Sequence, residues 1–348
     1  MATDTGLRTA GDPQGMLDLV RRLPEVCRRA WALGADVALS GEPPAAIVAI
    51  GMGGSGIGGD LLRTLLLDDV SIPVVVVKEY RLPAFVDAKT LVFVCSYSGN
   101  TEETLTAYAE AARRGATCVA ITSGGTLRER AQANGHQTVI VPAGIPPRAA
   151  LPYLFLPMVS ALSRNGVTRV LDEEAAEAAD VLAGILDDAE LDAPSNESRR
   201  LAAAFLHRIP VIYSATPFLE PAAQRWKDQL NENAKTFAVW NTFPELNHNE
   251  TVGWGLDADL AARLAVVVLH DGREAERLRR RVEITRDLAF ARAGSVDEVT
   301  TRGTGALARL LSVIAVGDLA SVYLALLRGV DPTPVAVIEE LKKRLSES

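Results

Sequence analysis

An apolar run that breaks into glycines, residues 46–60, is the most informative stretch of the chain. Residues 47–50 are continuously apolar rather than alternating, which is typical of a buried parallel strand. After the glycines, leucines recur at helical spacing, namely Leu61, Leu62, Leu65 and Leu66. The pattern predicts a strand, a glycine turn and a helix N-terminus, and such a junction favours bound anions because free N–H groups point at them.

The rest of the first half repeats this alternation of strand and helix. A leading helix is expected over residues 13–34, and an apolar helix over 151–162. Further strands are predicted at 73–80, 117–123 and 138–144. Residues 91–104 are predicted to contain another strand, which is followed by a helix. Because strands and helices alternate, the sheet should be parallel.

The second half restarts the same pattern after a surface helix or connector at 171–196. Its predicted strands are 209–216, 264–271 and 296–300, and residues 236–254 are expected to be irregular and polar. Its first predicted helix ends at His207. Three more helices are predicted over 221–235, 273–281 and 307–327, and a C-terminal helix is predicted to begin near Thr333.

Length and periodicity together predict an α/β protein of two three-layer α/β/α domains with mainly parallel sheets. A chain of 348 residues exceeds the usual size of one domain. We expect a first domain with its N-terminal helix over 1–165, a connector over 166–196, and a second domain with its C-terminal helix over 197–348.

Composition narrows the class of protein and of partner. With 48% hydrophobic and 23% charged residues, the chain has the composition of a globular protein. The net charge of −8 argues against a nucleic-acid or anionic-membrane partner. Cys27, Cys95 and Cys118 are isolated, which favours neither disulfides nor a cysteine metal site. Together with the absence of a leader pattern or a membrane-spanning run, this predicts a cytoplasmic protein.

The glycine turn invites comparison with a dinucleotide fingerprint, which it matches poorly. Gly51–Gly56 departs from the pattern at the end that should hold the pyrophosphate. The acidic residue expected at the tip of the next strand would be Glu79, which is unremarkable at that position. We therefore expect no nicotinamide cofactor.

A second turn carries hydroxyl groups at the end of the third predicted strand. Ser96, Ser98 and Thr101 precede a predicted helix, at the edge of the sheet where open α/β folds bind ligands. With the helix N–H groups they could bind a phosphate without a lysine or arginine. The alternative is that Ser98 or Thr101 only caps the helix, together with Glu102 or Glu103.

Taken together, five motifs resemble the bifunctional phosphoglucose/phosphomannose isomerase branch of the sugar isomerase (SIS) domain family. They are GMGGSGIGGD, SYSGNTEET, the PPR segment, LNENAK and PELNHNE, and they extend over nearly the whole chain. The resemblance implies two SIS domains, a homodimer, and an aldose–ketose isomerase that acts through a cis-enediolate. It also implies that Gly54 and Ser55 contact the substrate, while Ser96, Ser98 and Thr101 hold its phosphate.

This chemistry needs a base that moves a proton between adjacent carbons, and an acid–base pair that opens the sugar ring. Glu232 lies among amides and apolar residues near a predicted helix end, although most glutamates are simply solvated. The resemblance makes it the base. His248 lies in a polar loop without an apolar face, and histidine titrates in the range that ring opening requires. A metal site using His248 with Glu245 or Glu250 is the weaker alternative. In the family this histidine reaches the partner's site.

Two cations complete the implied site. Arg148 follows two prolines, and its alternative is a surface ion pair. The resemblance assigns it to the enediolate oxygen, which suits a permanently charged planar donor. Lys342, with Lys343 as its rival, is implied to assist ring opening. Val335 and Ala336 occupy the region where the family carries a threonine linked to mannose 6-phosphate, so the sequence leaves that substrate open.

Three functions remain in competition. The first is an isomerase of glucose 6-phosphate and fructose 6-phosphate, with or without mannose 6-phosphate, that uses no metal or cofactor. The second is a non-catalytic SIS sensor of sugar phosphates, against which the joint presence of Glu232, His248, Arg148 and Lys342 argues. The third is an SIS isomerase of another phosphosugar.

Overall fold

A computed structural model describes residues 11–39, 42–187, 193, 195–255 and 257–347. The chain divides into two compact units that do not follow its linear order. Unit 1 contains the described residues up to Arg21 together with Ile185–Thr301 and Val313–Ser348, and unit 2 contains Arg22–Gly184 and Arg302–Ser312. Part of the predicted connector, and most of the stretch before residue 13, lie outside the described residues.

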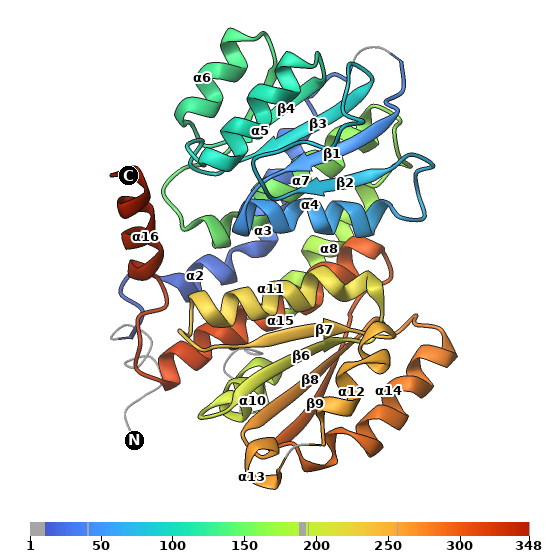
Figure 1. Ribbon diagram of the computed structural model, residues 1–348, viewed down its shortest axis with the longest axis vertical. Coiled ribbons are helices and arrows are strands. Elements are labelled where there is room, and N and C mark those ends of the chain that lie inside the picture. Colours follow the sequence, from blue (N-terminus) through green and yellow to red (C-terminus); the bar gives the residue numbers. More distant parts are fainter. Residues whose placement is uncertain (1–10, 40–41, 188–192, 194, 256, 348) are drawn as a thin grey trace. The chain divides into compact units, whose positions relative to one another are not determined.

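Unit 2 has a parallel sheet of five strands in the order β2-β1-β3-β4-β5 (Figure 1). Its strands are β1 Ala46–Ile50, β2 Val74–Val77, β3 Thr90–Cys95, β4 Thr117–Thr122 and β5 Gln137–Ile140. Its helices are α3 Leu23–Gly34, α4 Gly53–Leu66, α5 Glu102–Arg113, α6 Gly125–Ala133, η1 Pro147–Ala150, α7 Leu151–Arg164 and α8 Asp172–Ile185.

Side chains of β1 and β3 alternate between the two faces of this sheet, and both faces are buried. Val48 and Val92 point to the face covered by α5 and α6, where they pack with Tyr108 and Leu127. On the opposite face, the thiol of Cys95 lies 3.8 Å from a backbone oxygen of α7. The continuously apolar strands are therefore explained by a sheet covered on both sides, and the three-layer prediction is confirmed for unit 2.

Unit 1 has a parallel sheet of four strands in the order β7-β6-β8-β9. Its strands are β6 Ile209–Ser214, β7 Val239–Thr242, β8 Leu264–His270 and β9 Ser295–Thr300. Its helices are α2 Met16–Arg21, α10 Glu197–Phe205, η2 Pro217–Leu219, α11 Glu220–Glu232, η3 Glu245–His248, α12 Glu250–Gly253, α13 Ala258–Ala261, α14 Glu276–Leu288, η4 Phe290–Arg292, the larger part of α15 Ala306–Leu327, and α16 Ala336–Ser346.

Helix α15 is long and apolar enough to cross a membrane, but 89% of its most apolar window is buried inside the protein. In unit 1 it packs against α11, where the indole of Trp226 donates to the backbone oxygen of Val313 at 2.8 Å. Gly317 allows this packing, because a Cβ at that position would lie 2.3 Å from the Trp226 ring. The apolar composition of α15 is thus that of a core helix.

Several predicted elements were wrong in detail. The single helix expected over 13–34 is two helices, because Pro24 in the first turn of α3 has no N–H with which to continue the hydrogen-bond ladder of the preceding turn. The stretch expected to be irregular contains β7, an edge strand whose side chains are only partly buried. Helix α11 ends at Glu232 rather than at Lys235, whose φ of 51° lies in the left-handed region. Helix α14 begins at Glu276 instead of 273, and α6 was not predicted.

The three cysteines are free, and all three are buried. Burial raises the pKa of each thiol to about 12, so each thiol stays protonated near neutral pH. They act as small apolar side chains of the core.

A buried ion pair joins α11 to α15 within unit 1. The Arg225 guanidinium donates to both carboxylate oxygens of Asp318, at 3.1 and 2.7 Å, and both side chains are only 3% exposed. Because α11 carries Glu232 at its end, this pair fixes the helix on which the predicted base lies.

We predict that Arg225→Met alone lowers the free energy of unfolding by about 3–5 kcal/mol, because it leaves a buried carboxylate unpaired. The double variant Arg225→Met/Asp318→Leu should recover most of that loss, since no charge is then buried alone. Denaturant unfolding followed by tryptophan fluorescence measures both. A double variant that is less stable than the single variant would contradict this account.

Candidate functional site

The glycine turn begins where β1 ends and packs against the segment that carries Arg148. An added Cβ on Gly54 would lie 3.2 Å from the Cα of Arg148 and from the backbone oxygen of Pro147. Larger side chains would therefore separate the two segments. The structure thus brings Gly54 and Arg148, which are far apart in the sequence, into direct backbone contact within unit 2.

The serine turn is ordered by its own hydroxyl groups. Ser96 is fully buried, and its hydroxyl donates to Thr101 Oγ1 at 3.0 Å and accepts from the Gly99 N–H at 3.1 Å. Thr101 occupies the N-cap position of α5, yet its side chain bonds no N–H of the helix. The capping interpretation of Thr101 is therefore wrong, and the first N–H groups of α5 lack the intrahelical partners that later turns have.

Ser98 lies at the exposed tip of this turn. Its hydroxyl accepts from the Asn100 N–H at 3.2 Å, and its side chain is exposed. Ser55 is buried, and its hydroxyl accepts from the Tyr97 N–H at 3.3 Å. The glycine turn and the serine turn are therefore hydrogen-bonded to each other, so the five hydroxyl and glycine positions predicted from the sequence belong to one cluster of turns in unit 2.

Tyr97, which is not among the residues predicted from the sequence, connects this cluster to the Arg148 segment. Its phenol donates to the backbone oxygen of Pro142 at 3.0 Å and accepts from the Ile145 N–H at 3.1 Å. Burial raises the pKa of this phenol above its usual value, which keeps the donating proton in place. Its backbone oxygen also accepts from the Ser123 hydroxyl at 2.6 Å. The only signal in the sequence was an aromatic residue between two serines.

Arg148 is buried, with 4% of its surface exposed, in the short helix η1. This burial contradicts the alternative of a surface ion pair. A guanidinium stays charged even when buried, so it supplies a fixed positive charge beside the glycine turn.

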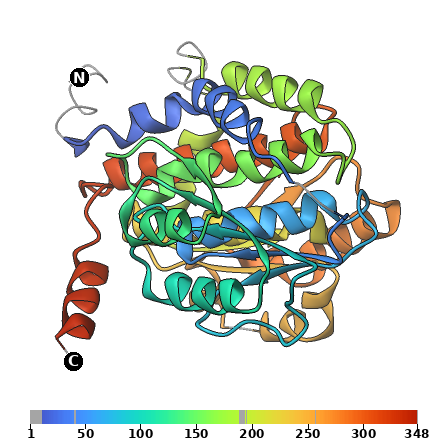
Figure 2. The ribbon, with the colours of Figure 1, turned by 90° about the horizontal axis from the view of Figure 1, so that it is seen from above.

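The other three predicted residues lie in unit 1, on three separate elements. Glu232 is the last residue of α11 and is partly buried. His248 ends η3 and is exposed. Lys342 lies on α16 and is exposed, and Figures 1 and 2 both show α16 apart from the sheet of unit 1.

Side-chain bonds on both sides of Glu232 hold the end of α11. Asn233 donates to the Ser321 hydroxyl at 2.9 Å, and Asn231 accepts from the Ala238 N–H at 3.2 Å. Lys235 donates to the backbone oxygen of Glu232 at 2.7 Å. The amides and the lysine of the LNENAK segment are therefore structural, and they fix the backbone from which the Glu232 carboxylate projects.

Two family models match the chain. The SIS domain model covers residues 44–149, and the model described as bacterial phospho-glucose isomerase C-terminal SIS domain covers residues 194–345. A bifunctional phosphoglucose/phosphomannose isomerase of Caldicellulosiruptor bescii is 40% identical over 336 residues, which are 95% of this chain and 99% of that protein. The chain belongs to the bifunctional phosphoglucose/phosphomannose isomerase family.

Two further similarities lie outside this group of sequences. A D-glucosamine-6-phosphate 4-epimerase of Sulfolobus acidocaldarius is 35% identical over 205 residues, which are 59% of this chain and 62% of that protein. A solved structure of a hypothetical protein of Thermus thermophilus matches with a TM-score of 0.71 at 18% identity, over 98% of this chain and 92% of that one. At that identity the second similarity concerns the fold alone.

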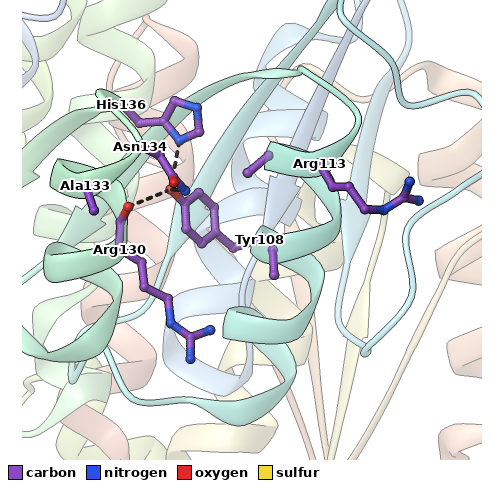
Figure 3. A pocket seen from close by; sticks show the side chains of 8 residues that line it. Tyr108, Arg113, Arg130, Ala133, Asn134 and His136 are labelled. Carbon is purple, nitrogen blue, oxygen red and sulfur yellow. Dashed lines mark hydrogen bonds between the residues drawn. The ribbon is translucent and has the colours of Figure 1, made fainter.

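A hollow of about 520 Å³ between α5 and α6 is unrelated to the turns described above (Figure 3). At its floor the Tyr108 phenol accepts from Asn134 at 2.9 Å and lies 2.8 Å from His136 Nδ1. Of the two arginines at its rim, Arg113 is paired with both carboxylate oxygens of Glu110. The buried Tyr108 is thus satisfied by the exposed Asn134 and the partly buried His136, which is the pattern of a structural cluster.

The serine turn depends on a close approach at Gly99. Its φ is +71°, and an added Cβ would lie 1.8 Å from the backbone oxygen of Gly124. Gly135 in the same unit has the same φ of +71°, but an added Cβ there would meet nothing within 4 Å. The two positions therefore separate the cost of the backbone conformation from the cost of the contact.

We predict that Gly135→Ala lowers the free energy of unfolding by about 1–2 kcal/mol, the cost of a left-handed alanine. Gly99→Ala should cost clearly more, because the turn must also move away from Gly124. Denaturant unfolding of both variants measures the difference. Equal losses would show that the contact between the two turns contributes nothing.

Proposed function

We propose that this protein is an aldose–ketose isomerase that interconverts glucose 6-phosphate and fructose 6-phosphate through a cis-enediolate. The observation that supports this most is the cluster of Ser96, Thr101 and Ser55 beside a buried Arg148, in a chain of this family. Hydroxyls and helix N–H groups suit a phosphate dianion, and the guanidinium suits a developing oxyanion.

The residues divide the reaction between them. Ser96, Ser98 and Thr101 hold the phosphate, and Gly54 and Ser55 contact the sugar beside it. The carboxylate of Glu232 takes the proton from C2 of the aldose and returns it to C1, a proton passes from the C2 hydroxyl to O1, and Arg148 stabilises the enediolate oxygen. His248 and Lys342 open the ring by moving a proton between the ring oxygen and the hydroxyl on the anomeric carbon. No redox cofactor is needed, because C1 is reduced as C2 is oxidised within one molecule, and Arg148 supplies the positive charge that a metal ion could otherwise supply.

Mannose 6-phosphate is a second substrate in this proposal. The relative from Caldicellulosiruptor bescii is named for both activities. The two aldoses differ only at C2 and give the same enediolate, and one base serves both when the site lets the substrate turn about its C2–C3 bond, because their C2–H bonds lie on opposite faces. Val335 and Ala336, at the start of α16, occupy the region where the family carries a threonine linked to this activity. The ratio of the activities on mannose 6-phosphate and glucose 6-phosphate is therefore the quantity to measure.

A second candidate is an SIS enzyme that acts on an amino-sugar phosphate. The D-glucosamine-6-phosphate 4-epimerase relative favours it, although that similarity covers 59% of the chain. A sensor without catalysis is the third candidate. The Arg148 guanidinium argues against it, because the serine turn alone could bind the phosphate and a sensor would not need a further positive charge.

We predict that the purified protein converts fructose 6-phosphate to glucose 6-phosphate in a coupled assay, with or without chelator. Glu232→Gln should lower kcat by roughly 10²–10⁴ and leave KM nearly unchanged, because the amide binds but cannot accept the proton. Ser96→Ala/Ser98→Ala should mainly raise KM, because each loses a donor worth about 0.5–1.5 kcal/mol. An inactive wild-type protein that still binds sugar phosphate would favour the sensor, and activity only on glucosamine 6-phosphate would favour the second candidate.

We further propose a cytoplasmic homodimer in which His248 completes the site of the partner subunit. The exposed position of His248 supports this arrangement. So do the exposed apolar side chains of α16, Val337, Leu341 and Leu345, which recur every four residues on one helical face.

If His248 acts across the interface, mixing Glu232→Gln subunits with His248→Ala subunits, which alone have only low residual activity, should restore activity. Up to about a quarter of wild-type activity is expected for equal, random exchange, because half of the dimers are mixed and each holds one intact site. If the two variants are prepared with different subunit masses, the mass of the mixed dimer verifies that subunits have exchanged. No recovery after exchange would place His248 in the site of its own chain.

A further inference from the structure

The segment that carries His248 is fixed to unit 1 by a partly buried carboxylate two residues away. Glu250, the first residue of α12, accepts one hydrogen bond at each carboxylate oxygen. Oε1 accepts from the Tyr213 phenol on β6, and Oε2 accepts from the Asn241 amide on β7. One side chain therefore links the polar loop to two neighbouring strands of the sheet.

The phenol of Tyr213 is held on its other side as well. Tyr213 is fully buried, its ring is stacked on Phe290 with centroids 5.2 Å apart, and its hydroxyl accepts from the Trp254 indole at 3.1 Å. Burial and the neighbouring Glu250 both raise the pKa of this phenol, so it remains protonated and donates to the carboxylate. The donor end of this hydrogen bond is thus buried in the core of unit 1.

The residue before His248 is fixed independently. The Asn247 amide donates to the Thr285 hydroxyl on α14 at 2.8 Å, and Leu246 is fully buried. After His248, the Asn249 side chain accepts from the Glu250 N–H at 2.6 Å. His248 is therefore an exposed side chain on a backbone that is held on both sides. Such an arrangement presents a group to a ligand in a fixed position.

We propose that Glu250, Tyr213 and Asn241 form a clamp that positions His248 for proton transfer. The inference rests on the proposed isomerase function and adds to it three positioning residues. It also assigns Glu250 a role other than that of the base, because both of its oxygens are already occupied by donors.

Tyr213→Phe tests the clamp, because phenylalanine keeps the ring stacking and removes only the hydroxyl. We expect kcat with fructose 6-phosphate to fall by about tenfold to a hundredfold, as for a catalytic group displaced by a fraction of an ångström to an ångström. KM should change less than about twofold, since no group that binds the phosphate is touched. Tyr108→Phe is the matched control: it removes an equally buried phenol from unit 2, and its kcat should remain that of the wild type.

The same substitution in a His248→Ala background shows whether the effect passes through His248. If it does, Tyr213→Phe should lower the residual activity less than about twofold, because there is no imidazole left to misplace. An equal loss in both backgrounds would overturn the proposal and indicate general destabilisation.

Amide hydrogen exchange provides a readout that does not depend on activity. Residues 245–253 should exchange faster in Tyr213→Phe than in the wild type, while the rest of β6 and β8 keeps its protection. Unchanged exchange of this segment would overturn the clamp even if the protein proved not to be an isomerase. Conversely, a wild type without isomerase activity but with the expected change in exchange would refute the function and leave the clamp in place.

Discussion

The candidate site of unit 2 depends on one tyrosine that holds four pieces of chain together. The backbone of Tyr97 bonds the glycine turn through Ser55 and the end of β4 through Ser123. Its phenol bonds both sides of the loop that leads to Arg148. Each of these pieces is a loop at the end of a strand, and loops have few packing contacts of their own. Tyr97 therefore fixes these pieces relative to one another, so less conformational entropy has to be lost when a ligand binds.

The parts of the fold that the sequence predicted are those with a signal inside one segment. Strands β1, β3, β4, β6 and β8 lie in the middle of their sheets with neighbours on both sides, and their apolar runs are continuous. Edge strand β7 was missed because Trp240, Asn241 and Thr242 are only partly buried and mix apolar with polar side chains. The assignment of α2 to unit 1 and of α3 to unit 2 depends on contacts between distant segments, which no local pattern contains.

The same distinction applies to the site. Ser96, Ser98 and Thr101 were found because they crowd one strand end, and Arg148 because two prolines precede it. Tyr97, Tyr213 and Asn241 were missed because each belongs to a strand or a strand end, where an aromatic or amide side chain looks like an ordinary sheet residue. Their roles come from partners on other segments, as the bonds of Tyr97 to Ser55 and Ile145, 42 and 48 residues away, illustrate. The roles of Glu232, His248 and Lys342 came from the resemblance to the family and not from such local signals.

Glu250 and Glu232 are held in place in different ways. Both carboxylate oxygens of Glu250 already accept a hydrogen bond, one from a phenol and one from an amide. The Glu250 side chain is therefore an anchor of its loop. At Glu232 the anchoring is done by its neighbours, since Asn231, Asn233 and Lys235 hold the backbone through their own bonds. A chain can therefore fix a glutamate in two ways, through the carboxylate itself, as at Glu250, or through the backbone and the side chains of adjacent residues, as at Glu232.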